Sequence, residues 1–506
     1  MNLEEKLRQL RRAAEKSSSE RDLERQLEGL RRRAASPVRL PLPPERVRRG
    51  VECYVEGCLQ TNRLGEYFLA RQALPFGRPY GKLRVGDVST ADLGALELFL
   101  EGAGLPDPAE LVYLDTETTG LAGGTGTCAF LIGLGMIEGS EFVVHQFFLR
   151  DYPDERAALE ALGNVLGGYQ GLVTFNGKTF DVPLLETRYA LARQKSPFAR
   201  LLHLDLLHPA RRLWKLRLER CPLTHLEREV LGISRKGDVD GADIPGIYFD
   251  YLRSGDARGL QPVFYHNALD IVTLAALTAE MARLIRVEAE ADEGPSGTQM
   301  PSLDLFSLSR IFERAGDAER SVSACRRALA AGLPEPIESE ALWHLATQHK
   351  RRGEYQQSAR IWTEITDRQG NYFFDALEQL AIHSEHRRRD FQAALEFTTS
   401  ALEWLKASTG SESTDGQIPR RSGSTVTYQI ERFTHRLERL KRKVARAASL
   451  PALVSSPAVQ VKERGRGYLS SSDLPSDLKT TCRRSVCSSP VAGSTVTISR
   501  SPTSRR

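Results

Sequence analysis

The sequence predicts a mixed α/β sheet flanked by helices, followed by an all-α repeat region and a disordered basic tail. Three strand-like segments lie next to one another after residue 110, and a helix, another short strand and a second helix follow them. Helical segments then recur at a nearly constant spacing up to about residue 405. Residues 406–506 are rich in Ser, Thr, Arg and Pro, apart from one helical pattern at 428–447, and this composition is typical of disorder.

The charge of the chain is divided unevenly between its middle and its ends. The 506 residues carry a formal net charge of +5, but residues 1–50 carry +6, residues 406–506 carry +12 and residues 51–405 carry −13. Proteins that hold nucleic acid by overall charge have a basic body. The acidic middle argues against that mode of binding and leaves local basic patches, metal ions or the tails as means of contact.

Other global features favour a cytoplasmic protein without a membrane partner. The N-terminal sequence MNLEEKLRQLRR is charged from the start, which argues against a secretory signal. No apolar run reaches the roughly 18 residues that a membrane span needs. The seven cysteines are an odd set without the spacing of metal ligands, as expected in a reducing compartment.

The first 107 residues are predicted to precede the main domain. Residues 1–50 combine amphipathic helical patterns with the proline-rich stretch PVRLPLPPERVRR, so a solvated basic arm is favoured over a dedicated RNA-binding arm. Residues 51–107 contain short strand patterns with turn signals, and a helical pattern follows at Ala91–Glu101. We interpret this second segment as a small β appendage with a helix.

Residues 108–285 carry the predicted mixed sheet. Strands are expected at LVYLD, TCAFLIGLG, EFVVHQFFL and LVTFN, and the second and third of these form a hairpin. Helices are expected at Asp154–Leu166 and Pro183–Arg193, and helices dominate from Leu206 to Leu284. This order of elements predicts a single α/β domain.

Residues 300–405 form the predicted repeat region. Aligning Gly316 with Gly353, and Glu354 with Asp390, gives periods of 37 and 36 residues, close to the helical hairpin of about 34 residues in tetratricopeptide arrays. Two interpretations stay open for these tetratricopeptide-like hairpins. They dock on the α/β domain, or they form a groove for a protein partner.

Carboxylates stand at three structurally distinct places in the α/β domain. Asp115 ends the apolar run LVYL, and Glu117 follows two residues later, on the same face of the strand. Close like charges cost stability unless a cation holds them. Asp181 follows a strand and a turn, and Asp270 lies four residues after His266 on one face of a helix. Each residue also has a purely structural explanation. Asp115 and Glu117 could belong to a solvated strand end, Asp181 could be a carboxylate stabilised at a helix N-terminus, and His266 could be a core histidine.

These residue types suit metal-assisted hydrolysis of a phosphodiester. Four carboxylates give oxygen ligands to two hard divalent ions, Mg²⁺ or Mn²⁺, which clamp the attacking and leaving oxygens. His266 is the candidate that takes the proton from the attacking water. Each motif alone is a weak indication of this chemistry. Their order along the chain, at a strand end, after a strand and a turn, and on a helix face, together indicates a hydrolytic metal site.

Candidate substrate-binding residues surround these carboxylates in the sequence. The loop Gly120–Gly126 lacks the Gly-Lys-Ser/Thr ending of a nucleotide-binding P-loop, so it is expected to give room to a substrate strand. Asn176 either orients the substrate or closes the FNG turn. A basic cluster around Trp214 either holds phosphates and stacks a base or forms a solvated helix face. The candidates are Thr118, Gly120, Asn176, Arg211, Arg212 and Trp214.

The segments LDTETTGLAGGTG, FNGKTFDVPLLETRY, HLDLLHPARRLW, CPLTHLEREVLG and HNALDIVTL carry a family resemblance. The region 108–285 resembles the YprB-like branch of the ribonuclease H-like superfamily, which is related to the DEDD 3′–5′ exonucleases. The resemblance implies a mixed sheet flanked by helices, exonuclease activity and two metal ions. The implied metal ligands are Asp115, Glu117, Asp181 and Asp270. A histidine, His266, occupies the spacing at which tyrosine-type members carry tyrosine, so its role as general base is open.

The sequence therefore favours a metal-dependent 3′–5′ exonuclease acting on single-stranded DNA or RNA ends. One alternative is a structure-specific endonuclease that uses the same site. Another is a scaffold in which the repeats bind a protein partner and the nuclease fold is secondary.

Overall fold

The computed structural model describes residues 50–100, 104–120, 126–290, 300–368, 370–410 and 423–448. The predicted N-terminal arm, apart from Gly50, and the predicted tail beyond residue 448 lie outside the described residues. Among the described helices, none combines the length and the hydrophobicity that a membrane span requires.

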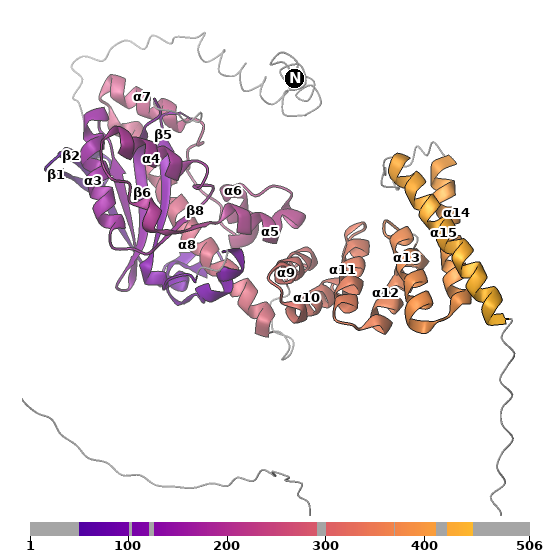
Figure 1. Cartoon of the computed structure of the whole chain (residues 1–506). Helices are drawn as coiled ribbons and strands as arrows, with labels where there is room; N and C mark the ends of the chain where they lie inside the picture. Colours follow the sequence, from indigo (N-terminus) through magenta and orange to yellow (C-terminus); the bar gives the residue numbers. More distant parts are fainter. Residues whose placement is uncertain are drawn as a thin grey trace, which may run out of the picture. The chain divides into compact units, whose positions relative to one another are not determined.

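Within the described residues, seven strands form one mixed sheet in the order β1-β2-β7-β6-β5-β8-β9 (Figure 1). In the sheet order, each strand from β1 through β2, β7 and β6 to β5 is antiparallel to the next, whereas β5, β8 and β9 run parallel to one another. This sheet confirms the predicted fold class. The strands are β1 (Gly57–Asn62), β2 (Gly65–Pro75), β5 (Leu111–Thr118), β6 (Ala129–Glu138), β7 (Glu141–Phe148), β8 (Gly171–Thr174) and β9 (Leu202–Asp205).

The segment predicted as a small β appendage is instead the edge of the main sheet. β2 pairs with β7 from Phe68↔Phe148 to Pro75↔Glu141, and β1 pairs with β2. The prediction was wrong on this point because a strand pattern does not reveal its partner, and burial of Phe68 against the main sheet decides the pairing. β3 (Pro79–Tyr80) and β4 (Leu83–Arg84) form a separate short hairpin.

Helices cover both faces of the sheet. On β5, Val112 and Leu114 pack in one core with α3 and α4, whereas Leu111 and Tyr113 pack in another core with α5 and α8. This alternation follows from the period of two in a strand. The α-helices of this part are α3 (Glu155–Leu166), α4 (Asp181–Leu191), α5 (Leu207–Leu218), α6 (Leu223–Leu226), α7 (Ile244–Ser254) and α8 (Gln261–Glu290).

Short helical turns complete the α/β part, and within the range predicted as a helix, Ala91–Glu101, the structure has one of them, η3. The 3-10 turns are η1 (Val51–Cys53), η2 (Val85–Thr90), η3 (Leu93–Phe99), η4 (Pro108–Glu110), η5 (Tyr152–Asp154), η6 (Phe198–Arg200) and η8 (Ala257–Leu260). A π-helical turn, η7 (Glu227–Leu231), follows α6. The structure also adds β9, a strand that the sequence patterns did not predict.

Two glycines on β6 let α8 lie close to the sheet. A Cβ atom at Gly133 would lie 2.3 Å from the Asn267 side chain, and one at Gly135 would lie 2.4 Å from Ile271. Gly133 is the register partner of Asp115 on the neighbouring strand. The glycines therefore bring α8 within side-chain reach of the end of β5.

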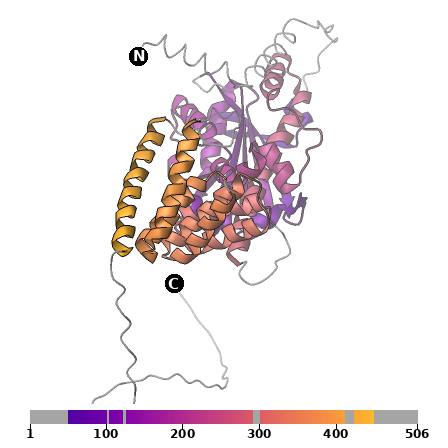
Figure 2. The ribbon, with the colours of Figure 1, turned by 90° about the vertical axis from the view of Figure 1, so that its right-hand side faces the viewer.

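The C-terminal part of the described chain is helical, and each helix from α9 to α14 packs on the next (Figure 1). Its π-helical turn is η10 (Ser384–Arg388), and Figure 2 shows α14 and α15 side by side. The assignment of these hairpins to the tetratricopeptide class, and the limits predicted for the repeat region, stay predictions. The α-helices are α9 (Ser302–Arg314), α10 (Ala318–Ala330), α11 (Ile337–Arg351), α12 (Tyr355–Arg368), α13 (Phe373–His383), α14 (Phe391–Gly410) and α15 (Gly423–Ala448).

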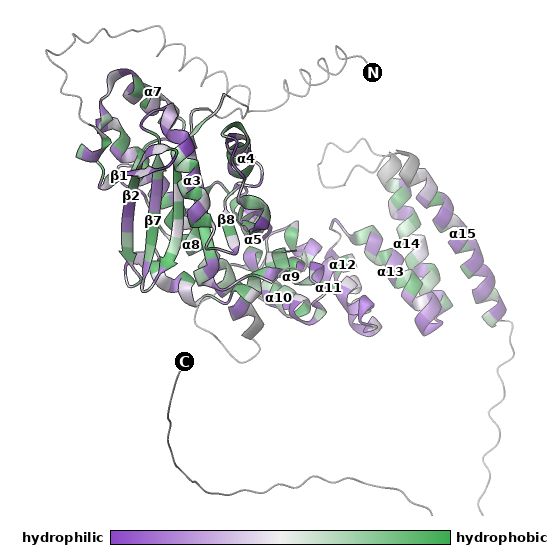
Figure 3. Cartoon of the chain, turned by 60° about the vertical axis from the view of Figure 1, so that its left-hand side comes forward, coloured by the Kyte–Doolittle hydropathy of each residue, from purple (hydrophilic) through white to green (hydrophobic). Residues whose placement is uncertain are grey.

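The hydropathy of the elements matches this packing. Figure 3 shows hydrophobic residues concentrated on the sheet and on α8, whereas α15 is largely hydrophilic. Phe433 of α15 is nevertheless buried against Phe374 of α13.

One hydrophobic core runs from α5 and α8 into α9 and includes Phe306 and Ile311. The first helical hairpin therefore packs on the α/β part.

Candidate active site

Asp115 is held in place by a relay of amide side chains. It lies on the face of β5 that α8 covers, and Asn267 Nδ2 donates to Asp115 Oδ2 at 3.0 Å. Gln146 of β7 in turn donates to Asn267 Oδ1 at 2.9 Å and to the backbone oxygen of Phe264 at 2.8 Å. Asn267 has no exposed surface. The relay fixes the Asp115 carboxylate between the sheet and α8.

Thr116 links the same strand end to Asp181 on the other side of the sheet. Its side chain alternates with those of Asp115 and Glu117, and Thr116 Oγ1 donates to Asp181 Oδ1 at 2.5 Å. Asp181 is the first residue of α4 and is largely buried. Because β5 ends where α4 begins, carboxylates from both faces meet at one edge of the sheet.

Asp205 shapes the loop that leads to Asp181. This buried carboxylate at the end of β9 accepts the backbone N–H groups of Asn176 at 2.7 Å and Lys178 at 3.1 Å. Asn176 adopts the left-handed region with φ 67°, which asparagine tolerates better than most residues. The backbone of Asn176 therefore closes the FNG turn, and a contact of its side chain with substrate stays a proposal.

A buried arginine lies against Asp270. Arg235 donates to Asp270 Oδ1, to Glu227 Oε2 and Oε1 at 2.6 and 2.7 Å, and to Asp238 Oδ2 at 3.0 Å. Burial alone would lower the pKa of Arg235, but the bonds to Glu227 and the charge of Asp270 hold it above its usual value. The chain thus supplies a permanent cation to one of the candidate metal ligands.

His266 lies between two carboxylates. Its Nδ1 is 2.9 Å from Asp238 Oδ1, and its Nε2 is 3.5 Å from Asp270 Oδ2. A carboxylate on Nδ1 fixes the ring orientation and directs Nε2 toward the carboxylate cluster. Tyr265 is instead 44% exposed and lines a separate cavity. His266, as predicted from helix geometry, is therefore the neighbour of Asp270.

Burial and mutual repulsion raise the pKa values of the clustered carboxylates. Burial raises the pKa of Asp115 well above its usual range, and repulsion from Asp270, Glu117 and Asp181 adds to this. Burial is also the largest cause that raises the pKa of Glu117 to about 7 and that of Asp181 to about 6. Burial raises the pKa of Asp270, whereas Arg235 opposes the shift.

The donor set fits hard divalent metal ions. Oxygen ligands on carboxylates that repel one another gain most from a bound cation. Among the residues that the structure describes, no three His, Cys, Asp or Glu side chains meet in the arrangement of a formed metal site. The four candidate carboxylates nevertheless lie close enough to repel one another, and Arg235 is the cation of the chain that pairs with Asp270.

The candidate substrate-binding residues near β5 lie at the mouth of a loop. Thr118 Oγ1 donates to the backbone oxygen of Gly120 at 3.1 Å, and Thr119 pairs with Cys128 to close the loop. A methyl group at Gly120 would meet no atom within 4 Å. Most of the predicted glycine-rich loop, residues 121–125, lies outside the described residues.

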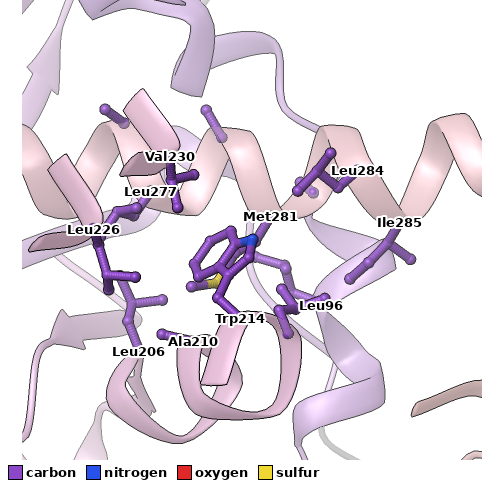
Figure 4. Packing of buried hydrophobic residues seen from close by; sticks show 14 of the residues in the cluster. Leu96, Leu206, Ala210, Trp214, Leu226, Val230, Leu277, Met281, Leu284 and Ile285 are labelled. Carbon is purple, nitrogen blue, oxygen red and sulfur yellow. The ribbon is translucent and has the colours of Figure 1, made fainter. Parts of the chain in front are cut away.

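Trp214 does not have the position predicted for base stacking. It is 1% exposed and packs among Leu96, Ala210 and Met281 (Figure 4). The prediction that it stacks a base was wrong because the residue faces the hydrophobic core on the inner side of α5. Arg211 and Arg212 lie on the exposed side of the same helix.

Sequence reasoning missed the residues that hold the site together. Arg235 and Asp238 lie in a loop between η7 and α7, without a motif, and reach the site only through the tertiary fold. Asn267, next to His266, faces Asp115, and its spacing on the helix was a usable signal. The residues missed are Thr116, Gln146, Glu227, Arg235, Asp238 and Asn267.

The comparisons with known proteins agree with this fold. Residues 112–282 match the family model of the RNase_H superfamily. This part of the chain is therefore a ribonuclease H-like domain, which indicates a nuclease that contacts nucleic acid. The chain is also 29% identical over 294 residues to "Uncharacterized protein YprB" of Bacillus subtilis (strain 168), and this alignment covers 58% of the chain and 69% of that protein.

Proposed function

We propose that the protein is a metal-dependent 3′–5′ exonuclease that hydrolyses phosphodiester bonds at single-stranded DNA or RNA ends, in the cytoplasm. The observation that carries the proposal is the convergence of Asp115, Glu117, Asp181 and Asp270 beside His266 at one edge of a ribonuclease H-like sheet. These residues come from β5, α4 and α8, in the order that the family resemblance implies.

The four carboxylates are the residues that would hold Mg²⁺ or Mn²⁺. Two such ions, when bound, stabilise the charges on the attacking and leaving oxygens of a phosphodiester. The protein contributes fixed positions for the ligands: Asn267 orients Asp115, and Thr116 orients Asp181. Hydrogen bonds of this kind prevent the carboxylates from rotating away from a bound ion.

His266 is the proposed proton acceptor. Asp238 accepts from Nδ1, so Nε2 is the nitrogen that faces the carboxylates and is free to take a proton from water. The negative charge of Asp238 also stabilises the imidazolium that this transfer creates. Asp238 itself is held by Arg235 at 3.0 Å.

The test is a cleavage assay on end-labelled single strands of DNA and RNA, with Mg²⁺, with Mn²⁺ or with EDTA. We expect stepwise loss of nucleotides from the 3′ end only with metal, and no cleavage of a circular strand. Asp115→Asn should abolish cleavage, whereas Glu186→Gln, at an exposed carboxylate on α4, should not. Cleavage in EDTA or by Asp115→Asn would refute the proposal, and cleavage of the circle would make the enzyme an endonuclease.

A further inference from the structure

A basic groove lies between the α/β part and the first helix of the C-terminal part. Its volume is about 490 Å³, and α5 and α9 form its walls. The α5 wall consists of His208, Arg211, Arg212, Lys215 and Leu216, and the α9 wall of Ser307, Arg310, Ile311 and Arg314. On both helices these residues recur at intervals of three and four, so each wall is one helix face.

The groove carries positive charge that the described residues do not neutralise. In the described part of the chain, no carboxylate pairs with Arg211, Lys215 or Arg314, and all three side chains are exposed. Arg310 is paired with Glu340 at 3.2 Å, and Arg212 lies 6.0 Å from the ring of Phe99. A cluster of unpaired cations is unusual in the middle of a chain whose residues 51–405 carry a net charge of −13.

The two walls are held together as one surface. Arg217 Nε of α5 donates to both carboxylate oxygens of Asp304 of α9 at 2.9 Å, Arg217 Nη2 lies 2.8 Å from Asp304 Oδ2, and Asp304 is buried. Bidentate contacts of this kind fix the relative orientation of two elements. The helices also share a hydrophobic core through Leu213 and Ile311. The charges on both helices can therefore act on one ligand.

The groove begins at the edge of the sheet that carries the catalytic carboxylates. β5, β8 and β9 are parallel, so their carboxyl ends lie at the same edge. Asp115 and Glu117 lie at the end of β5, and α5 starts two residues after Asp205 at the end of β9. From there His208, Arg211 and Lys215 extend along the helix for about 10 Å.

We propose that this groove binds the phosphate backbone of a nucleic-acid strand whose 3′ end lies among the carboxylates. The inference rests on the proposed exonuclease function for the position of the 3′ end. In this arrangement Arg211, Lys215 and Arg314 hold the 5′ part of the strand, and the C-terminal helices contribute to substrate binding through α9. Phosphate contacts of this kind are independent of base sequence and sensitive to salt.

The test compares full-length protein with the variant Arg211→Gln/Lys215→Gln/Arg314→Gln. Binding of a labelled single-stranded oligonucleotide is measured by fluorescence anisotropy in EDTA, over a range of salt concentrations. Each lost phosphate contact reduces the log–log salt slope by about 0.7, so we expect a slope smaller by about 2 and binding roughly 10- to 100-fold weaker. In the presence of metal, KM for a long strand should rise by a similar factor, while cleavage of a dinucleotide should not change.

The matched control is Arg156→Gln/Arg193→Gln/Lys195→Gln. These exposed cations lie on α3 and after the C-terminal end of α4, away from Asp181 at the opposite end of that helix. The control removes the same charge and should bind like the unmodified protein. An equal loss of binding in both variants would overturn the proposal.

The outcomes separate the groove from the nuclease activity. Unchanged binding and salt slope in the groove variant would overturn the groove and leave the exonuclease intact. Loss of binding in that variant, together with a failure of the unmodified protein to cleave with metal, would support the groove and refute the exonuclease. Polyglutamate that competes as well as an oligonucleotide of equal charge would identify an acidic polypeptide as the ligand and overturn a nucleic-acid role.

Discussion

Replacement of Glu117 by glutamine should make the metal-free protein more stable at neutral pH. Burial is the main cause that raises the pKa of Glu117 from 4.5 to about 7, and Asp270 and Asp181 add to the shift. Below pH 4.5 the carboxyl is protonated in both the folded and the unfolded chain, so it costs nothing. Between pH 4.5 and about 7 only the unfolded chain releases the proton, so stability is lost as pH rises.

The size of the effect follows from the same shift. A change from 4.5 to about 7 corresponds to roughly 3 kcal/mol, at about 1.4 kcal/mol per pH unit. Glu117 retains some solvent exposure, which screens part of this energy. We therefore expect Glu117→Gln to raise the free energy of unfolding by about 2 kcal/mol at about pH 8, and by less than about 0.5 kcal/mol below pH 4.5.

The assay is urea unfolding in EDTA, followed by circular dichroism at both pH values. Glu186→Gln is the control, because this exposed carboxylate on α4 should change stability by less than about 0.5 kcal/mol at either pH. Addition of Mg²⁺ should then stabilise the unmodified protein more than Glu117→Gln, since the variant lacks one ligand. A Glu117→Gln protein that gains no stability between low and high pH, relative to the unmodified chain, would refute the reasoning.

Three further substitutions test the packing around the site. Gly133→Ala should lower the free energy of unfolding by about 1–3 kcal/mol and the cleavage rate roughly 100-fold, because its Cβ would meet the side chain of Asn267. The control Gly246→Ala, whose Cβ would have no neighbouring atom within 4 Å, should change neither stability nor cleavage. Trp214→Phe should lower thermal stability by about 1–3 kcal/mol and leave oligonucleotide affinity unchanged; weaker binding would revive the stacking role. Arg235→Gln should destabilise the metal-free protein by about 3–5 kcal/mol in urea unfolding, since it strands three carboxylates, and an unchanged midpoint would contradict this.

Local patterns in the sequence were sufficient for most of the α/β fold. The run LVYL, the hairpin of β6 and β7, and the helices α3 and α4 each have a clear period, so their type followed from side-chain spacing. The pairing of β2 with β7 did not follow, because a strand pattern carries no information about a partner more than 60 residues away. β9 has only four residues and escaped the same patterns.

The residues of the candidate site were also only partly predictable from the sequence. Asp115 and Glu117 stand out in the sequence because like charges on one strand face are costly without a cation. Asp181 stands out by its place after a strand and a turn, and Asp270 by its spacing of four residues from His266 on one helix face. The face of Trp214 was misjudged for a related reason. A basic helix with one aromatic residue fits both a stacking surface and a core anchor, and only contact with α8 distinguishes them.

The sequence by itself was enough to propose the kind of chemistry, since four carboxylates and a histidine in these contexts suit metal-assisted phosphodiester hydrolysis. The tertiary structure decided how those groups are held. Asn267 reaches Asp115 because glycines on β6 admit α8, and Arg235 reaches Asp270 from a loop 35 residues earlier in the chain. Such contacts depend on the distance between packed elements, which side-chain spacing along one segment does not encode.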